Sequence, residues 1–135
     1  IHIYMKVLII GSGGREHALC WAIKKSKKVS DLYCIPGNAG TNFIAKNVEI
    51  NLSDFSKLKE FIKNKGINLV IVGPEKPLVD GLVDFLENNG INVFGPNKFA
   101  SQLEGSKTFT KELCERYSIP TARYGIFNNK QDVLK

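Results

Sequence analysis

The sequence predicts an α/β fold built on a doubly wound parallel sheet. Continuous apolar runs typical of buried strands alternate with segments in which apolar residues recur at helical spacing. Glycine and proline mark most of the turns between them. Because parallel strands need long crossovers, this alternation favours right-handed strand–helix–strand units in one sheet.

The first strand and the turn after it are the most informative part of the chain. Apolar residues at 7–10, preceded by Met5, predict a buried strand over 5–10, and a helix is expected over 14–25. A strand, a glycine turn and a helix N-terminus in this order direct unpaired N–H groups and the positive end of the helix dipole at one point. We therefore expect this turn to bind an anionic group, unless it is only a tight turn. Its candidate residues are Gly11, Ser12, Gly13, Gly14 and Arg15.

A dinucleotide fingerprint is only partly met. Gly11 and Gly13 fit the pattern G-x-G-x-x-G, but Glu16 stands where the third glycine would be. The second strand, expected over 31–35, leads into the turn 36–40 without the carboxylate that would hold a ribose. A nicotinamide cofactor is therefore disfavoured.

The remaining elements continue the alternation. A strand is expected near 47–50, followed by a helix that is capped by Ser53 or Asp54 and stopped at 65–66. A strand over 67–72, a helix over about 78–88 with Gly90 as C-cap, and a strand over 91–94 come next. After these we expect a short helix over 97–103, a helix capped by Ser106, a break at 118–122, a strand over 123–127 and a helix from 131. The last strand and helix cannot bury an apolar face alone. We therefore expect a domain over 5–105 and a truncated second domain over 106–135, with 1–4 an N-terminal extension or cloning remnant.

Two further strand ends carry turn residues that could contact a ligand, since ligands bind beyond the carboxyl ends of parallel strands. The candidates are Pro36, Gly37, Asn38 and Gly40 in one turn, and Gly73, Pro74 and Glu75 in the other. Glu75 lies between two prolines that stiffen its loop. Its carboxylate suits a hydroxyl or an amine, and a helix-capping role is the alternative.

Composition and charge limit the kinds of molecule that the protein is expected to bind. Of 135 residues, 43% are hydrophobic and 24% charged, which are ordinary globular values. The net charge is +6, but the densest lysine run, at 24–28, lies where the first helix should end and complements its dipole. Nucleic acid is therefore disfavoured, and anionic phosphorylated metabolites explain the charge more simply.

The cysteines indicate a reducing compartment. Cys20, Cys34 and Cys114 are odd in number and lack C-x-x-C spacing, so buried free thiols in a cytoplasmic protein are expected. No run approaches 18 apolar residues and no signal-peptide pattern is present, so no membrane partner is expected.

Six motifs occur here in the order and spacing found in one enzyme family. They are GSGGREHAL at 11–19, PGNAG at 36–40, GPEKPLVDGLVD at 73–84, FGP at 94–96, LEGSKTFTK at 103–111 and IPTARY at 119–124. From Met5 onward the chain resembles the N-terminal part of the phosphoribosylamine–glycine ligase (glycinamide ribonucleotide synthetase) family, in the ATP-grasp superfamily. The resemblance implies a Rossmann-like domain followed by the start of an ATP-grasp domain.

The family resemblance also implies an activity. Family members use ATP to join glycine to 5-phosphoribosylamine, giving glycinamide ribonucleotide, ADP and phosphate in de novo purine synthesis. The turns 11–15 and 36–40 would then lie at the sugar phosphate, Glu75 at the ribose, and Lys107 at the ATP phosphates unless it is only a solvated lysine. The family's Mg²⁺ or Mn²⁺ ligands and catalytic residues lie beyond 135, so this chain alone should be inactive and hold no metal or cofactor.

Two other functions are weighed against this one. Another ATP-grasp carboxylate–amine ligase, or a biotin-dependent carboxylase subunit, would share the sheet but not the pair GSGGREHAL and LEGSK. A non-catalytic module that binds a nucleotide or sugar phosphate is the alternative outside catalysis. The oligomeric state is not predicted by any of these patterns.

Overall fold

The computed structural model describes residues 4–127 and 129–133. Within it the chain forms two compact units, residues 1–101 and residues 102–135. The extension predicted at 1–4 lies mostly outside the described residues. The predicted domain boundary after residue 105 stays a prediction.

The first unit is built on a five-stranded sheet in which every neighbouring pair is parallel. The strand order is β3-β2-β1-β4-β5. The strands are β1 (Met5–Gly11), β2 (Val29–Pro36), β3 (Lys46–Asn47), β4 (Leu69–Val72) and β5 (Val93–Phe94). This order, with β1 and β4 central and crossovers leading outward from both, confirms the doubly wound parallel α/β fold.

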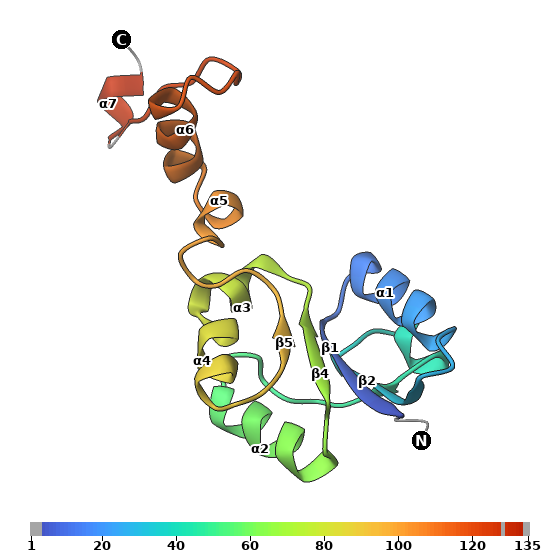
Figure 1. The fold of residues 1–135 in the computed structure, drawn as a ribbon. Coiled ribbons are helices and arrows are strands. Elements are labelled where there is room, and N and C mark those ends of the chain that lie inside the picture. The colour runs from blue at the N-terminus through green and yellow to red at the C-terminus, as the bar shows by residue number, and fades with distance from the viewer. Residues whose placement is uncertain (1–3, 128, 134–135) are drawn as a thin grey trace. The chain divides into compact units, whose positions relative to one another are not determined.

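Helices cover both faces of this sheet (Figure 1). On one face lies α1 (Gly14–Lys24), and on the other lie α2 (Phe55–Lys65), α3 (Glu75–Asp80) and α4 (Leu82–Asn88). A short 3₁₀ helix, η1 (Thr41–Phe43), precedes β3. Each helix therefore buries its apolar side against one of two cores that share the strands.

The side chains of β1 alternate between these two cores. Leu8 and Ile10 pack with the residues of α2, α3 and α4, whereas Val7 and Ile9 pack on the side of α1 with Cys20. Both faces of β1 are buried from Val7 to Ile10, so this part of its sequence is continuously apolar rather than alternating. This explains why an unbroken apolar run predicted the strand correctly.

The helical segment after β4 differs from the prediction. The helix expected over 78–88 is two helices, α3 and α4, separated by Gly81. Gly81 has φ +95°, a left-handed conformation that ends α3 and that glycine adopts without steric cost. The helix also begins earlier than predicted, at Glu75, directly after Pro74.

The predicted N-caps agree with the structure, whereas the C-cap of α4 is Asn89 and not the predicted Gly90. The Asp54 side chain accepts a hydrogen bond from the Lys57 N–H at 3.0 Å and begins α2, which ends before the left-handed Gly66. The Ser106 hydroxyl accepts a bond from the Phe109 N–H at 3.2 Å and begins α6 (Lys107–Arg116). Short polar side chains thus satisfy N–H groups that the first helical turn leaves unpaired.

Two predictions for the chain after β5 are wrong. The short helix over 97–103 is a turn followed by α5 (Gln102–Gly105), because Asn97 accepts a bond from the Ala100 N–H and closes a turn instead. The strand expected over 123–127 is an irregular segment. The second unit, where described, holds no strand that could pair with it, and the segment is held by side chains such as Tyr124, which donates to Glu115 at 2.7 Å.

Helix α7 (Lys130–Val133) begins near the predicted position, and the rest of the predicted helix lies outside the described residues. All three cysteines are free thiols. Cys20 and Cys34 are buried as expected, but the prediction of a buried Cys114 is wrong, because no residue of α6 is fully buried. None of the helices in the described ranges has the length and apolar character that a membrane crossing needs.

The central position of β1 gives a stability prediction. Leu8 is fully buried, so Leu8→Ala should lower the free energy of unfolding by about 3 kcal/mol through lost burial and the cavity left behind. Leu103 is 49% exposed, and Leu103→Ala should cost less than about 1 kcal/mol. Urea unfolding followed by circular dichroism measures both. Equal losses would contradict the assignment of the core to β1.

Candidate functional site

The carboxyl ends of β1 and β4 meet at the point where the sheet topology reverses. The crossover from β1 leads through α1 to β2, whereas the crossover from β4 leads through α3 and α4 to β5 on the opposite side. Loops that diverge in this way leave a crevice between them, where ligands of open α/β sheets bind. A cavity of about 370 Å³ lies here.

The cavity is formed by three segments that are distant in the sequence. They are the glycine turn after β1, the loop before α2, and the first turns of α3; the lining residues are Gly11, Ser12, Gly13, Arg15, Glu16, Leu52, Ser53, Pro74, Lys76, Pro77 and Asp80. Five predicted residues are among them. The predicted residues Gly14, Pro36, Gly37, Asn38, Gly40, Gly73 and Glu75 are not, although several contact the lining.

The glycine turn is shaped by one left-handed residue and one buried side chain. Gly11 has φ +129°, which side-chain-bearing residues rarely adopt. Gly13 has φ −90°, so its backbone needs no glycine, but a side chain there would meet the Glu16 carboxylate at 2.9 Å. At Gly13, therefore, the reason for glycine is the space that Glu16 occupies.

Glu16 was predicted only as a departure from the dinucleotide fingerprint, and in the structure it holds the turn together. Its residue surface is 2% exposed. One carboxylate oxygen accepts the Gly13 N–H at 2.6 Å, and the other accepts Arg15 Nε at 3.1 Å. The anion that the helix N-terminus attracts is thus supplied, in part, by the protein itself.

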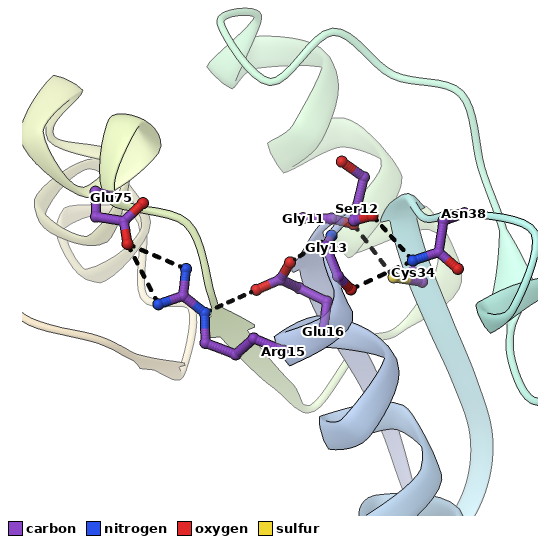
Figure 2. A network of polar contacts seen from close by, with 8 residues as sticks. All are labelled: Gly11, Ser12, Gly13, Arg15, Glu16, Cys34, Asn38 and Glu75. Carbon is purple, nitrogen blue, oxygen red and sulfur yellow. Dashed lines mark hydrogen bonds and ion pairs between the residues drawn. The ribbon is translucent and has the colours of Figure 1, made fainter.

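Arg15 joins the two strand ends (Figure 2). Its Nη1 and Nη2 both lie 3.3 Å from one oxygen of Glu75, while its Nε faces Glu16. The hydrogen bond to Glu16, and less strongly that to Glu75, raises the pKa of Arg15 above its ordinary value. The guanidinium is half exposed and Glu75 is 44% exposed, so this pair is accessible to a ligand, whereas Glu16 is not.

The turn over 36–40 supports the glycine turn from the other side. Asn38 Nδ2 lies 2.9 Å from the Ser12 carbonyl and 3.3 Å from the Gly13 carbonyl, and the Gly37 N–H donates to the Gly11 carbonyl at 3.1 Å. Figure 2 shows Asn38 directed at the turn. The two predicted turns are therefore in contact, although this one does not line the cavity.

Asn38 is itself fixed by a buried hydroxyl. The Thr41 side chain, fully buried, accepts the Asn38 N–H at 2.7 Å and donates to Asn47 Oδ1 at 2.8 Å. Asn47 Nδ2 in turn donates to the Asn38 carbonyl at 2.8 Å. Neither Thr41 nor Asn47 was predicted as part of the site, because a threonine and an asparagine outside a turn motif give no sequence signal.

The far wall of the cavity carries a second charged pair. Lys76 Nζ lies 2.8 Å from an Asp80 carboxylate oxygen across one turn of α3. Their spacing of four residues is readable in the sequence and could have been recognised. Leu52 and Ser53, which come from the loop before α2, could not, because only the tertiary fold brings them here.

Lys107, the predicted ATP contact, is the first residue of α6 in the second unit. It is exposed. Among the described residues, no three histidine, cysteine, aspartate or glutamate side chains are grouped so that they could hold a metal ion.

Comparison with known proteins identifies the family. Residues 5–104, which include the cavity and both turns beside it, match the family described as phosphoribosylglycinamide synthetase, N domain. This chain belongs to that family. The match confirms the resemblance drawn from the six motifs. It extends from β1 into α5 of this chain.

Individual relatives agree with this assignment. A phosphoribosylamine–glycine ligase from Brucella melitensis is 55% identical over 125 residues, covering 93% of this chain and 29% of the relative. The crystal structure of that ligase from Thermotoga maritima has a TM-score of 0.61 at 35% identity, covering 88% of this chain and 26% of its own. N5-carboxyaminoimidazole ribonucleotide synthetase from Thermus thermophilus shares the fold alone. Its TM-score is 0.67 at 19% identity, and the match covers 95% of this chain and 34% of that synthetase chain. This chain thus spans about three-tenths of the length of the curated relatives it matches.

The buried network behind the turns gives a second stability prediction. Thr41→Val keeps the side-chain shape but leaves the Asn38 N–H and Asn47 Oδ1 without a partner, so it should cost about 1–3 kcal/mol of unfolding free energy. Thr108→Val, at an exposed position of α6, should cost less than about 1 kcal/mol. Denaturant unfolding of both variants tests this. An unchanged stability of Thr41→Val would mean that water satisfies these groups.

Proposed function

We propose that this chain is the substrate-binding N-terminal part of a phosphoribosylamine–glycine ligase. The complete enzyme would use ATP to join glycine to 5-phosphoribosylamine, producing glycinamide ribonucleotide, ADP and phosphate in purine biosynthesis. The observation that carries the proposal is the cavity at the topological switch point, because it lies inside the family match and is lined by the motif GSGGREHAL.

The cavity has the groups that a phosphorylated sugar needs. Arg15 would bind the phosphate with its exposed guanidinium edge, aided by the N-terminus of α1 and the Ser12 hydroxyl. Glu75 would accept hydrogen bonds from ribose hydroxyls. The pair Arg15–Glu75 would then open, each partner exchanging the other for a group of the ligand.

The other predicted residues would support this binding from behind. Pro36, Gly37, Asn38 and Gly40 would keep the glycine turn in place through Asn38, and Gly73 and Pro74 would fix the position of Glu75 after β4. Gly14 would let the first turn of α1 approach the ligand, since nothing lies within 4 Å of a side chain placed there.

ATP and Mg²⁺ or Mn²⁺ would bind chiefly to the remainder of the complete enzyme. Within this chain Lys107 alone is proposed as a contact to ATP, where its ammonium group would neutralise phosphate charge. No metal ligand is proposed among the described residues, which lack a suitable cluster of donors. When bound, ATP would supply the phosphoryl group that activates glycine, and the metal would neutralise phosphate charge.

Binding to the chain itself tests the proposal most directly. Titration calorimetry should detect ribose 5-phosphate, a stable analogue of phosphoribosylamine, and should detect AMP much more weakly. Preference for AMP would favour a nucleotide-binding module instead. Binding of neither ligand would contradict a substrate site in this cavity.

A chimaera tests the activity. The 135-residue chain alone should form no glycinamide ribonucleotide. Joined in register to the part of the Brucella melitensis ligase that follows the matched region, it should form product that depends on ATP, glycine and phosphoribosylamine. Product from the isolated chain, or a folded chimaera that turns over a different amine, would contradict the proposed function.

Glu75→Gln tests the ribose contact in the same chimaera. The substitution keeps the shape and removes a charge-assisted hydrogen bond of roughly 1.5–3 kcal/mol, so use of phosphoribosylamine should weaken about 10- to 100-fold. The KM for ATP should hardly change. Steady-state kinetics with each substrate varied in turn separates the two. A loss confined to ATP, or matched by an equal loss of stability, would make Glu75 a helix residue without a substrate contact.

A further inference from the structure

We infer that Glu16 is a positioning residue of this site: its buried carboxylate fixes the glycine turn and holds Arg15 in the orientation in which it meets the ligand. The inference rests on the proposed function in that it deepens the part assigned to Arg15. It starts from the two donors that Glu16 accepts, the Gly13 N–H and Arg15 Nε.

The surroundings of Glu16 are built for a side chain of this size. A Cβ atom placed on Gly11 would lie 2.6 Å from the Glu16 Cδ, one on Gly13 2.9 Å from its Oε2, and one on Gly73 would overlap its Oε1. These glycines come from the end of β1, the turn and the end of β4. Three glycines of the predicted phosphate and ribose loops therefore make room for a carboxylate of the protein.

Only a carboxylate fits the two donors. Each of its oxygens accepts one N–H group, and neither donor could be satisfied by an NH₂ group. A glutamine in either orientation would face one of the donors with its own N–H groups. The requirement for two acceptors at this length explains why the chain has glutamate where a dinucleotide fold has glycine.

The arrangement also determines how Arg15 acts. Glu16 is buried and takes Nε, so the Nη1 and Nη2 edge remains directed toward Glu75, which is exposed. A ligand can replace Glu75 at this edge without disturbing the buried half of the contact. Glu16 therefore holds Arg15 in the free and the bound state alike, whereas Glu75 is exchanged.

Two variants remove this support in different ways. Glu16→Gln abolishes one of the two accepted bonds. Gly73→Ala adds a methyl group that overlaps the Glu16 Oε1 and so displaces the carboxylate. Glu60→Gln is the matched control, since Glu60 is exposed on α2. Thermal unfolding identifies any variant that is not folded, and the other variant then decides.

The first measurement needs no ligand. The chain has three arginines, so the Nε–H signal of Arg15 can be assigned in a ¹⁵N spectrum by its loss in Arg15→Lys. Its hydrogen exchange should be slow in the wild-type chain and at least about 10-fold faster in Glu16→Gln and Gly73→Ala, because a charge-assisted bond is lost. Unchanged exchange in both variants overturns the inference.

The second measurement connects the position of Arg15 to binding. Glu16→Gln should weaken ribose 5-phosphate binding about 10-fold, and Glu60→Gln should not. In an Arg15→Ala background Glu16→Gln should cost less than it does alone, because the part of its effect that passes through Arg15 is already lost. Tighter binding by Glu16→Gln, or additive losses in the double variant, overturns the inference. If the wild-type chain binds no ribose 5-phosphate, the proposed function fails, and hydrogen exchange alone then decides whether Glu16 holds Arg15.

Discussion

The parallel pairing of β1 with both β2 and β4 is the constraint on which the first unit depends. Because β1 has a neighbour on each side and a helical layer on each face, its residues from Val7 to Gly11 are buried. The chain can leave this strand only at its carboxyl end, where it must turn sharply into α1. The crevice, the glycine turn and the accessible charges all lie where this enclosed strand ends.

The sequence was sufficient for the parts of the fold that depend on local pattern. Continuous apolar runs predicted β1 and β4, and short polar side chains predicted the starts of α2 and α6. The strand expected near 47–50 overlaps β3 only at Asn47, because β3 consists of two polar residues at the edge of the sheet. The break at Gly81 was missed because its helical spacing continues on both sides, and only the left-handed backbone of that residue separates the helices. The segment 123–127 has strand-like residues, but a strand also needs a partner, which propensity does not supply.

The residues of the candidate site also fall into two groups, those that a local sequence pattern predicts and those that only tertiary packing brings to the site. Gly11, Ser12, Gly13, Arg15 and Pro74 were predicted because they follow strands whose ends converge in any parallel sheet. Leu52 and Ser53 come from a loop and Thr41 from η1. Their positions at the site depend on tertiary packing, so no sequence pattern pointed to them as site residues. Glu16 was noticed in the sequence, but it was compared only with the dinucleotide-binding motif, in which a glycine stands at this position. In the structure its carboxylate accepts the hydrogen bonds that hold the turn.

The space shared by Glu16 and Gly73 has a consequence for comparing sequences. The two residues stand in different motifs, yet a side chain at position 73 would overlap the carboxylate that begins at position 16. In a homologue with a shorter side chain at 16, the steric reason for glycine at 73 disappears, while Gly11 keeps its own reason in its left-handed backbone. Positions 16 and 73 should therefore covary across an alignment, and position 11 should vary independently of them.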